Sequence, residues 1–156
     1  AIAYLIKLLK YNFIEEISVI LANYLIKFID QKALYLLRNL QPYLVIAVPL
    51  HNKRRRWRGF NQAELIADRL AENYSLKIEK RSLVRTKHKE PQAKLKEKDR
   101  ITNIKNSFAW RGQNLRGENV ILVDDIVTTG ATLDECARVL KQNGAGDVWG
   151  LVVAKG

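Results

Sequence analysis

The sequence predicts an α/β fold built on a mainly parallel, twisted sheet flanked by helices. Two continuous apolar runs of strand length, Leu44–Val48 and Val120–Val123, lack alternating polar residues, which is typical of strands buried on both faces. Each run leads through a turn or loop into apolar residues with helical spacing. Strands that alternate with helices are joined by right-handed crossovers, and ligands bind beyond the carboxyl ends of such strands.

Residues 1–40 are predicted to be helical and to serve packing rather than chemistry. Asn12 is a candidate N-cap, with Glu15 three residues later to complete a capping box. Gln31–Leu40 is predicted to add a further helical turn or two. The main helix is indicated by apolar residues at spacings of three and four: Ile14, Ile17, Ile20, Leu21, Tyr24, Leu25 and Phe28.

The first apolar run, Leu44–Val48, is predicted to be a strand that ends at Pro49 and leads through a basic loop to another helix. Asn61 is a candidate N-cap of this helix, and Glu64 has the spacing of its capping-box partner. The buried face of the helix is expected to contain Leu65, Ile66 and Leu70. Because a strand, a loop and a helix N-terminus follow one another, we expect that an anion can be held here.

The middle of the chain is predicted to hold short strands around a long exposed loop. Leu76–Ile78 and Leu83–Val84 have the composition of short strands, whereas Arg85–Arg100 is polar, basic and almost free of core residues. Loops of this length in compact domains are usually functional, and often lids. Asn106–Arg111 alternates as a half-exposed strand does, and Gly112–Gly117 turns the chain.

Neither histidine predicts a metal site formed by protein side chains. His88 lies in the exposed loop with no second histidine or cysteine at ligand spacing. His51 follows the first strand, where it can contact a ligand or serve as a local hydrogen-bonding residue.

The strongest functional signal is the stretch Val120–Thr132, which reads VILVDDIVTTGAT. The strand runs into Asp124 and Asp125, and a turn of small and hydroxyl-bearing residues follows at Thr128–Thr132. Because helix N-termini present free N–H groups and a positive dipole end, this turn is predicted to hold an anion. The carboxylates beside it would accept hydrogen bonds from hydroxyls, as suits a phosphorylated sugar. The alternative is an ordinary strand–turn–helix unit whose aspartates cap the turn.

The turn is predicted to open a helix over Leu133–Asn143, with Gly144 as the residue that ends it. Cys136 falls on the apolar stripe of this helix and is expected to be a small core residue. A last buried strand is predicted over Val148–Val153.

The composition indicates a globular protein with an unusual charge. A chain of 156 residues, 47% hydrophobic and 28% charged, suits one domain. Its net charge of +11 predicts polyanionic partners, although a basic surface that serves solubility is an alternative. The single cysteine fits a reducing compartment, so we expect a cytoplasmic protein. No membrane span is predicted, because the most apolar run, Ile17–Ile29, is too short to cross a bilayer.

A basic cluster follows the first strand: Lys53, Arg54, Arg55 and Arg56 directly precede Trp57. Arginines beside an aromatic ring that can stack on bases are typical of single-stranded nucleic-acid binding. The alternative is a solvated arginine run in which Trp57 is a partial anchor in the core.

Two stretches resemble known families. Val120–Thr132 resembles, at every position, the phosphoribosyl-pyrophosphate (PRPP) signature of type I phosphoribosyltransferases. The stretch VPLHNKRRRWRGFNQ, from Val48 to Gln62, is similar to one found in the ComF/GntX family. That family also places matching residues in and after the long loop, namely Arg85, Pro91, Gln92, Leu95, Arg100, Asn103 and Phe108. The resemblance runs from about residue 44 to the end of the chain.

The resemblance implies a type I phosphoribosyltransferase-like fold in one domain, with a helical part at 1–42, a PRPP-binding core at 43–156 and a flexible loop. Asp124 and Asp125 would accept hydrogen bonds from the ribose 2′- and 3′-hydroxyls. The 5′-phosphate would be wrapped by Thr128, Thr129, Gly130, Ala131 and Thr132.

The resemblance further implies a pyrophosphate loop formed by Pro49, Leu50 and His51. Mg²⁺ bound mainly to the ligand's own oxygens would assist this loop, and Arg58 would add positive charge there. The loop that would close over the reaction carries Lys87 and Arg100, which would stabilise departing pyrophosphate.

The resemblance also implies a role in DNA uptake during natural transformation, with single-stranded DNA and the uptake machinery as partners. The alternative is an active phosphoribosyltransferase in nucleotide salvage with an unknown acceptor. Family members often carry an upstream, cysteine-rich zinc-binding segment, and this sequence lacks the cysteines for it. Since the chain begins at Ala1 and contains no methionine, we expect truncation rather than natural absence of that segment.

Overall fold

The computed structural model describes residues 16–33, 43–50, 55–57, 59–86 and 104–155. In chain order its elements are α2 (Glu16–Phe28), the π-helix η1 (Ile29–Ala33), β1 (Tyr43–Ala47), α5 (Gln62–Tyr74), β2 (Lys77–Glu79), β3 (Leu83–Arg85), β4 (Phe108–Trp110), β5 (Asn119–Val127), α7 (Ala131–Gln142) and β6 (Val148–Lys155).

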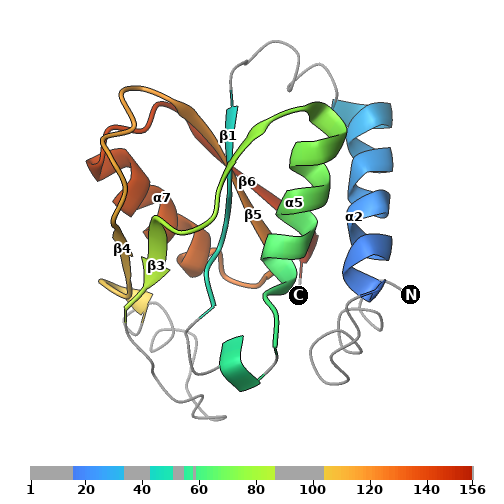
Figure 1. Cartoon of the computed structure of the whole chain (residues 1–156), viewed down its shortest axis with the longest axis horizontal. Coiled ribbons are helices and arrows are strands. Elements are labelled where there is room, and N and C mark those ends of the chain that lie inside the picture. Colours follow the sequence, from blue (N-terminus) through green and yellow to red (C-terminus); the bar gives the residue numbers. More distant parts are fainter. Residues whose placement is uncertain (1–15, 34–42, 51–54, 58, 87–103, 156) are drawn as a thin grey trace.

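The centre of the fold is a four-stranded sheet in the order β2-β1-β5-β6, and all of its pairs are parallel. Helices α2 and α5 lie on one face of the sheet, and α7 lies on the other together with the antiparallel β3–β4 pair (Figure 1). The predicted parallel α/β sheet flanked by helices is confirmed. The carboxyl ends of β1 and β5 meet at the same edge of the sheet because these two neighbours run in the same direction.

The two central strands, β1 and β5, are apolar throughout because both of their faces are covered. Val45 and Val123 pack with α2 and α5 in one core cluster, whereas Ile46 and Leu122 pack with α7 in the other. All four side chains are almost fully buried. Burial on both faces removes the alternation of polar residues that a half-exposed strand would show.

The prediction that the last strand is buried is wrong. β6 is the edge strand of the sheet, and none of its residues is fully buried. Trp149 is 45% exposed. The apolar sequence of β6 predicted a strand correctly, but its place in the strand order leaves it only one paired neighbour among the described residues.

The predicted N-terminal helix is confirmed over Glu16–Phe28, and the candidate cap Asn12 lies outside the described residues. The helix continues as η1, so the turn predicted after Gln31 is π-helical as far as Ala33. The hydroxyl of Tyr74 on α5 donates to the carboxylate of Asp30 at 2.8 Å, which holds η1 against α5. That hydrogen bond and burial together raise the pKa of Tyr74, with burial the larger cause.

The strands predicted around the long loop are confirmed with shifted bounds. The first, predicted over Leu76–Ile78, is β2, and the other two form the antiparallel β3–β4 pair. The strand predicted over Asn106–Arg111 is shorter, because Asn106 has a positive φ of 58° and cannot continue extended backbone. Residues 87–103, between β3 and β4, lie outside the described residues.

Candidate anion site at the end of the central strands

The predicted acidic pair lies inside β5 rather than after it. The strand continues through Asp124 and Asp125 to Val127, because these residues pair with the second half of β6. Successive residues of a strand point to opposite faces. Asp125 is accordingly buried toward the α2–α5 side, whereas Asp124 is half-buried on the α7 side, and its carboxylate accepts the backbone N–H of Asp125 at 2.8 Å. The two carboxylates therefore flank the strand at its carboxyl end.

The turn after β5 leaves the N-terminus of α7 open. Thr128 and Thr129 are exposed, and Gly130 is the N-cap of α7 with a φ of 83°. No side chain makes a capping hydrogen bond at this N-cap. The nearest substitute is a long contact of 3.4 Å from the Ala131 N–H to the hydroxyl of Thr129. The first amides of a helix have no intrahelical partner, so those of α7 are available to an anion beside the two aspartates.

The helix begins at Ala131, two residues before the predicted Leu133, so Ala131 and Thr132 belong to the helix rather than to the turn. Its end agrees with the prediction: Asn143 is the C-cap and Gly144 follows with a φ of 87°. Cys136 is fully buried, as predicted. Burial, with the nearby Asp124 carboxylate, raises the pKa of its thiol, so Cys136 stays protonated and serves packing.

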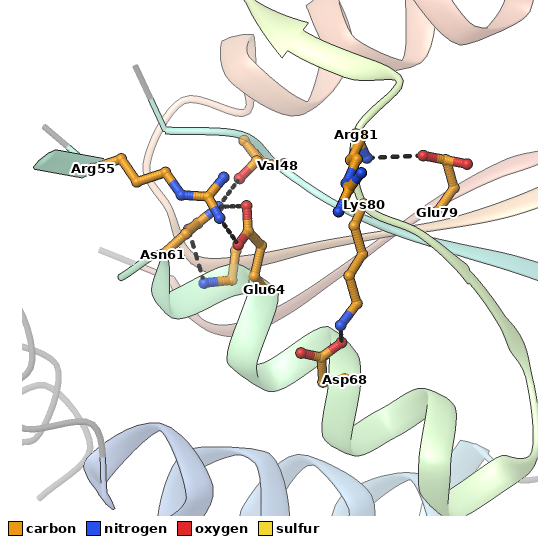
Figure 2. Close-up of polar contacts among 9 residues, drawn as sticks. Val48, Arg55, Asn61, Glu64, Asp68, Glu79, Lys80 and Arg81 are labelled. Carbon is orange, nitrogen blue, oxygen red and sulfur yellow. Dashed lines mark hydrogen bonds and ion pairs between the residues drawn. The ribbon is translucent and has the colours of Figure 1, made fainter. Parts of the chain in front are cut away.

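In the second strand–turn–helix unit, β1 to α5, a side chain of the unit itself caps the helix N-terminus and bonds the end of the strand (Figure 2). Asn61 caps α5 as predicted, since its side-chain oxygen accepts the Ala63 N–H at 3.1 Å, and its amide donates to the carbonyl of Val48 at 3.1 Å. Glu64 departs from the predicted capping box, because its carboxylate accepts from the Asn61 side chain at 3.3 Å and from Arg55 at 3.0 Å. Side chains thus cap the N-terminus of α5, and the prediction that this turn holds an anion stays a prediction.

The residues predicted for the pyrophosphate loop begin beside the acidic pair. The Val48 N–H donates to the carbonyl of Val123 at 2.8 Å, which continues the β1–β5 pairing by one residue. Pro49 and Leu50, both half-buried, follow directly and so lie next to the carboxyl end of β5. His51 and Arg58 of the same prediction lie outside the described residues, as do Lys87 and Arg100.

The described part of the basic cluster is a helical turn over residues 55–57. It contacts the first turn of α5 through the hydrogen bond from Arg55 to Glu64. Arg55 is half-exposed and paired with Glu64, whereas Arg56 is exposed. Trp57 is 69% exposed, so the alternative in which it anchors this turn in the core is wrong. Lys53 and Arg54 lie outside the described residues. An arginine and an indole ring are thereby presented to solvent near the carboxyl ends of the strands.

Residues 56–154 match the family described as phosphoribosyl transferase domain. The chain belongs to this family. The predicted type I phosphoribosyltransferase-like fold is confirmed by this match together with the parallel sheet and its flanking helices.

Several relatives of this phosphoribosyl transferase domain carry competence names, which confirms the predicted ComF-type resemblance. Competence protein F from Haemophilus influenzae is 38% identical over 117 residues, 72% of this chain and 51% of that protein. DNA utilization protein YhgH from Escherichia coli O6:H1 is 36% identical over 107 residues, 69% of this chain and 47% of that protein. Competence protein ComFC from Bacillus subtilis is 35% identical over 102 residues, 65% of this chain and 40% of that protein.

The chain spans about half the length of the first two relatives. Among solved structures, TT1426 from Thermus thermophilus is similar over 85% of this chain and 81% of its own, with a TM-score of 0.45 and 14% identity. No helix in the described part of the phosphoribosyl transferase domain is long and apolar enough to cross a membrane. Within the same residues, no three acidic, histidine or cysteine side chains gather where they could hold a metal ion.

A polar cluster on α7 was not predicted from the sequence. The carboxylate of the buried Glu135 accepts three hydrogen bonds: from the Asn106 N–H at 2.7 Å and from Arg138 at 2.7 and 2.8 Å. Arg138, with the Asn106 N–H and in spite of burial, holds the pKa of the Glu135 carboxyl below its ordinary value. This cluster joins the segment before β4 to α7, the helix that follows the turn at residues 128–130. The sequence signal, a Glu and an Arg three residues apart, also occurs in any ordinary exposed helix.

The same cluster forms one wall of an open pocket of about 280 Å³ beside the turn that follows β5. The pocket extends from the turn along the face of α7 toward the residues that precede β4. It is lined by Ile104, Lys105, Thr129, Ala131, Asp134, Glu135 and Arg138. A ligand held at the turn would therefore have further space on this side.

Replacing Glu135 with Gln is expected to lower the free energy of unfolding at neutral pH by about 1–3 kcal/mol, because charge-assisted hydrogen bonds to a buried acceptor are lost. The folded pKa of Glu135 lies below its unfolded value. The stabilisation is therefore present above the unfolded pKa, about 4.3, and is lost as the pH falls through the folded pKa. Urea unfolding of both proteins at about pH 7 and about pH 3 measures the difference, which should shrink in acid. The exposed Glu72→Gln serves as control, and a loss of stability independent of pH would contradict this account.

Proposed function

We propose that this ComF-like domain binds PRPP with Mg²⁺ at the β5–α7 turn and acts in the cytoplasm in the uptake or handling of single-stranded DNA. One observation supports the proposed binding of PRPP. Of the two strand–turn–helix units described, only β5–α7 leaves its helix N-terminus without a side-chain cap, and it does so beside two carboxylates. The DNA role is supported by relatives that are named competence protein F and DNA utilization protein.

In this proposal the backbone amides at Thr128–Thr132 hold the 5′-phosphate, and the acidic pair accepts the ribose hydroxyls. Asp124 and Asp125 are adjacent near the carboxyl end of β5, which suits the two neighbouring hydroxyls of one ribose. Pro49, Leu50 and His51 border the pyrophosphate, and Arg58 adds positive charge. Hard oxygen ligands suit Mg²⁺, which would be held mainly by the ligand's own phosphates and would neutralise their charge.

The proposal includes transfer of the phosphoribosyl group as a second candidate function. Its support is the pocket of about 280 Å³ beside the phosphate turn, which offers space for an acceptor. Displacement at the anomeric carbon needs charge neutralisation and exclusion of water rather than a protein nucleophile. Lys87 and Arg100 would stabilise the departing pyrophosphate in this function. Pyrophosphate release from PRPP in the presence of candidate nucleobases would distinguish transfer from binding alone.

Calorimetric titration with PRPP and Mg²⁺, with a single-stranded oligonucleotide, and with both together tests the proposal. We expect saturable PRPP binding that weakens when Mg²⁺ is replaced by a chelator. Ribose 5-phosphate should bind more weakly, since it lacks the pyrophosphate. No binding of PRPP at any Mg²⁺ concentration would overturn the assignment of the turn.

The DNA surface is tested separately by the double variant Arg56→Ala/Trp57→Ala. Both residues are exposed, so their loss should leave the fold intact while it removes one phosphate contact and one stacking ring. Stacking on an aromatic ring contributes about 1–3 kcal/mol per base, so we expect at least a fivefold to tenfold weaker affinity for an oligothymidylate. Fluorescence anisotropy at several salt concentrations measures it. The matched control is Arg116→Ala, an exposed arginine elsewhere. Equal affinity of the double variant and the wild type would show that this turn does not contribute to DNA binding.

A further inference from the structure

The exposed apolar side chains gather on one flank of the molecule. Among the described residues six large apolar side chains are exposed, and five of them lie on the outer face of α2 or on β6. They are between 44% and 57% exposed: Val19, Ile20, Tyr24, Phe28 and Trp149. The sixth is Trp57, in the basic turn. An apolar patch of this kind on a soluble domain is typical of an interface.

The two edges of the sheet differ in their protection. β2, at one edge, has only three residues, two of them the charged Lys77 and Glu79. β6, at the other, has eight residues without proline, and its one charge is the terminal Lys155. Short length and charge are the usual means by which edge strands avoid pairing with another chain. β6 has neither, and among the described residues it pairs with β5 alone.

The α2 patch and the open edge belong to the same surface. α2 is the outer helix of its layer and lies over β6 (Figure 1). Ile17 and Leu21 share a core cluster with Val153 and Ala154, whereas Leu25 shares one with Leu151. The helix therefore packs on the part of β6 between Leu151 and Ala154.

We propose that β6 pairs antiparallel with β6 of a second copy of this chain, about a two-fold axis through Leu151, so that the two sheets become one. An axis perpendicular to the sheet keeps both α2 helices on the same face, where their exposed stripes meet. A second strand would pair with the row of backbone N–H and C=O groups along the edge of β6, which is why the proposed occupant is a strand. An isologous contact requires that the surface match itself.

The strand matches itself in this register. With Leu151 on the axis, Trp149 lies opposite Val153 of the second copy, an aromatic and β-branched pair that stabilises antiparallel strands. Asp147, just before the strand, lies opposite Lys155, so opposite charges meet at both ends. The exposed Gly150, opposite Val152, offers no side chain to clash.

The helix matches itself about the same axis. With Tyr24 of α2 at the axis, Ile20 lies opposite Phe28 of the second copy, and Glu16 lies opposite Lys32. Tyr24 precedes Leu25, which belongs to the core cluster of Leu151. The proposal places Tyr24 on the axis through Leu151, so that the helix and the strand are self-complementary about one axis. This self-complementarity favours a second copy over a different protein as the occupant.

Sedimentation velocity across a wide range of protein concentration tests the proposal with the whole chain. We expect a dimer that dissociates on dilution. Tyr24→Lys and Trp149→Lys should each give a monomer with unchanged circular dichroism, since both side chains are exposed and the first change places like charges face to face at the axis. Trp57→Lys is the matched control and should remain a dimer. A wild-type monomer up to the solubility limit, or a dimer that survives both flank variants, would overturn the proposal.

Oxidative cross-linking tests the register. Leu151→Cys should form an intermolecular disulfide, because a residue on the axis faces its own copy within the Cα separation that a disulfide needs. Val153→Cys faces Trp149 instead and should not cross-link. The natural Cys136 is fully buried and gives no background. A dimer in which Val153→Cys cross-links and Leu151→Cys does not would refute pairing about Leu151.

Discussion

The double variant Asp124→Asn/Asp125→Asn is expected to lose at least a hundredfold in affinity for PRPP with Mg²⁺. Each carboxylate would accept a hydrogen bond from a ribose hydroxyl, and hydrogen bonds to charged groups contribute about 1.5–3 kcal/mol each. Two such losses give about 3 kcal/mol or more, which corresponds to a factor of more than one hundred. Asparagine keeps the shape of the side chain, so the strand should persist. Calorimetric titration measures the affinity.

Stability must be measured beside affinity, because Asp125 is 8% exposed and its replacement also perturbs the interior. Thermal unfolding of the double variant shows whether the fold is retained at the temperature of the titration. Asp147→Asn, an exposed acid at the opposite end of the strands, is the matched control and should bind as the wild type does. Unchanged affinity of a folded double variant would refute the ribose assignment.

Asn61→Ala is expected to produce the largest loss of stability among single polar replacements, about 2–4 kcal/mol. Asn61 is almost fully buried and makes three hydrogen bonds, to Val48, Ala63 and Glu64. Alanine removes the N-cap of α5, which costs about 1 kcal/mol, and leaves the buried carbonyl of Val48 without its donor. Because the same side chain ties the end of β1 to α5, the site should loosen together with the fold.

Asn61→Asp separates the cap from the other two hydrogen bonds. A carboxylate caps a helix as well as an amide does, but it cannot donate to Val48 and it repels Glu64. We therefore expect a loss of stability at neutral pH larger than the loss of a cap alone, about 1 kcal/mol, measured by urea unfolding. A stability equal to that of the wild type would show that the donors to Val48 and Glu64 contribute little.

Local signals predicted most of the elements that form the candidate site. A continuous apolar run followed by acids, small residues and a helical stripe is readable without the fold, and β5, the turn and α7 appear where it placed them. The cap at Asn61 was likewise predicted, because capping depends on residues close in the sequence. The predictions that were wrong concern features that depend on contacts between distant segments. β5 extends through Val127 because β6 pairs with it there. The Glu64 carboxylate accepts a hydrogen bond from Arg55 because the helical turn at residues 55–57 lies beside α5.

The strand order and the polar cluster on α7 could not be predicted from these local sequence signals. The apolar sequence of β6 reads alike whether the strand is central or at an edge, so its exposure on one side could not be predicted. Glu135 is buried because Asn106, 29 residues away, donates to it. Neither the spacing of Glu135 and Arg138 nor their charge indicates that a distant amide completes the cluster.

The Asn106–Glu135 hydrogen bond makes one amide proton a reporter of the whole site. This N–H is bonded at 2.7 Å to a helix residue only one turn beyond the N-terminus of α7, where the phosphate is proposed to bind. A ligand that stabilises α7 should also stabilise the hydrogen bond that Asn106 donates to Glu135 on that helix. The rate at which the Asn106 amide exchanges with deuterated solvent should therefore slow when PRPP binds, and by less in Glu135→Gln. Binding can thus be followed by a backbone proton on the segment that precedes β4.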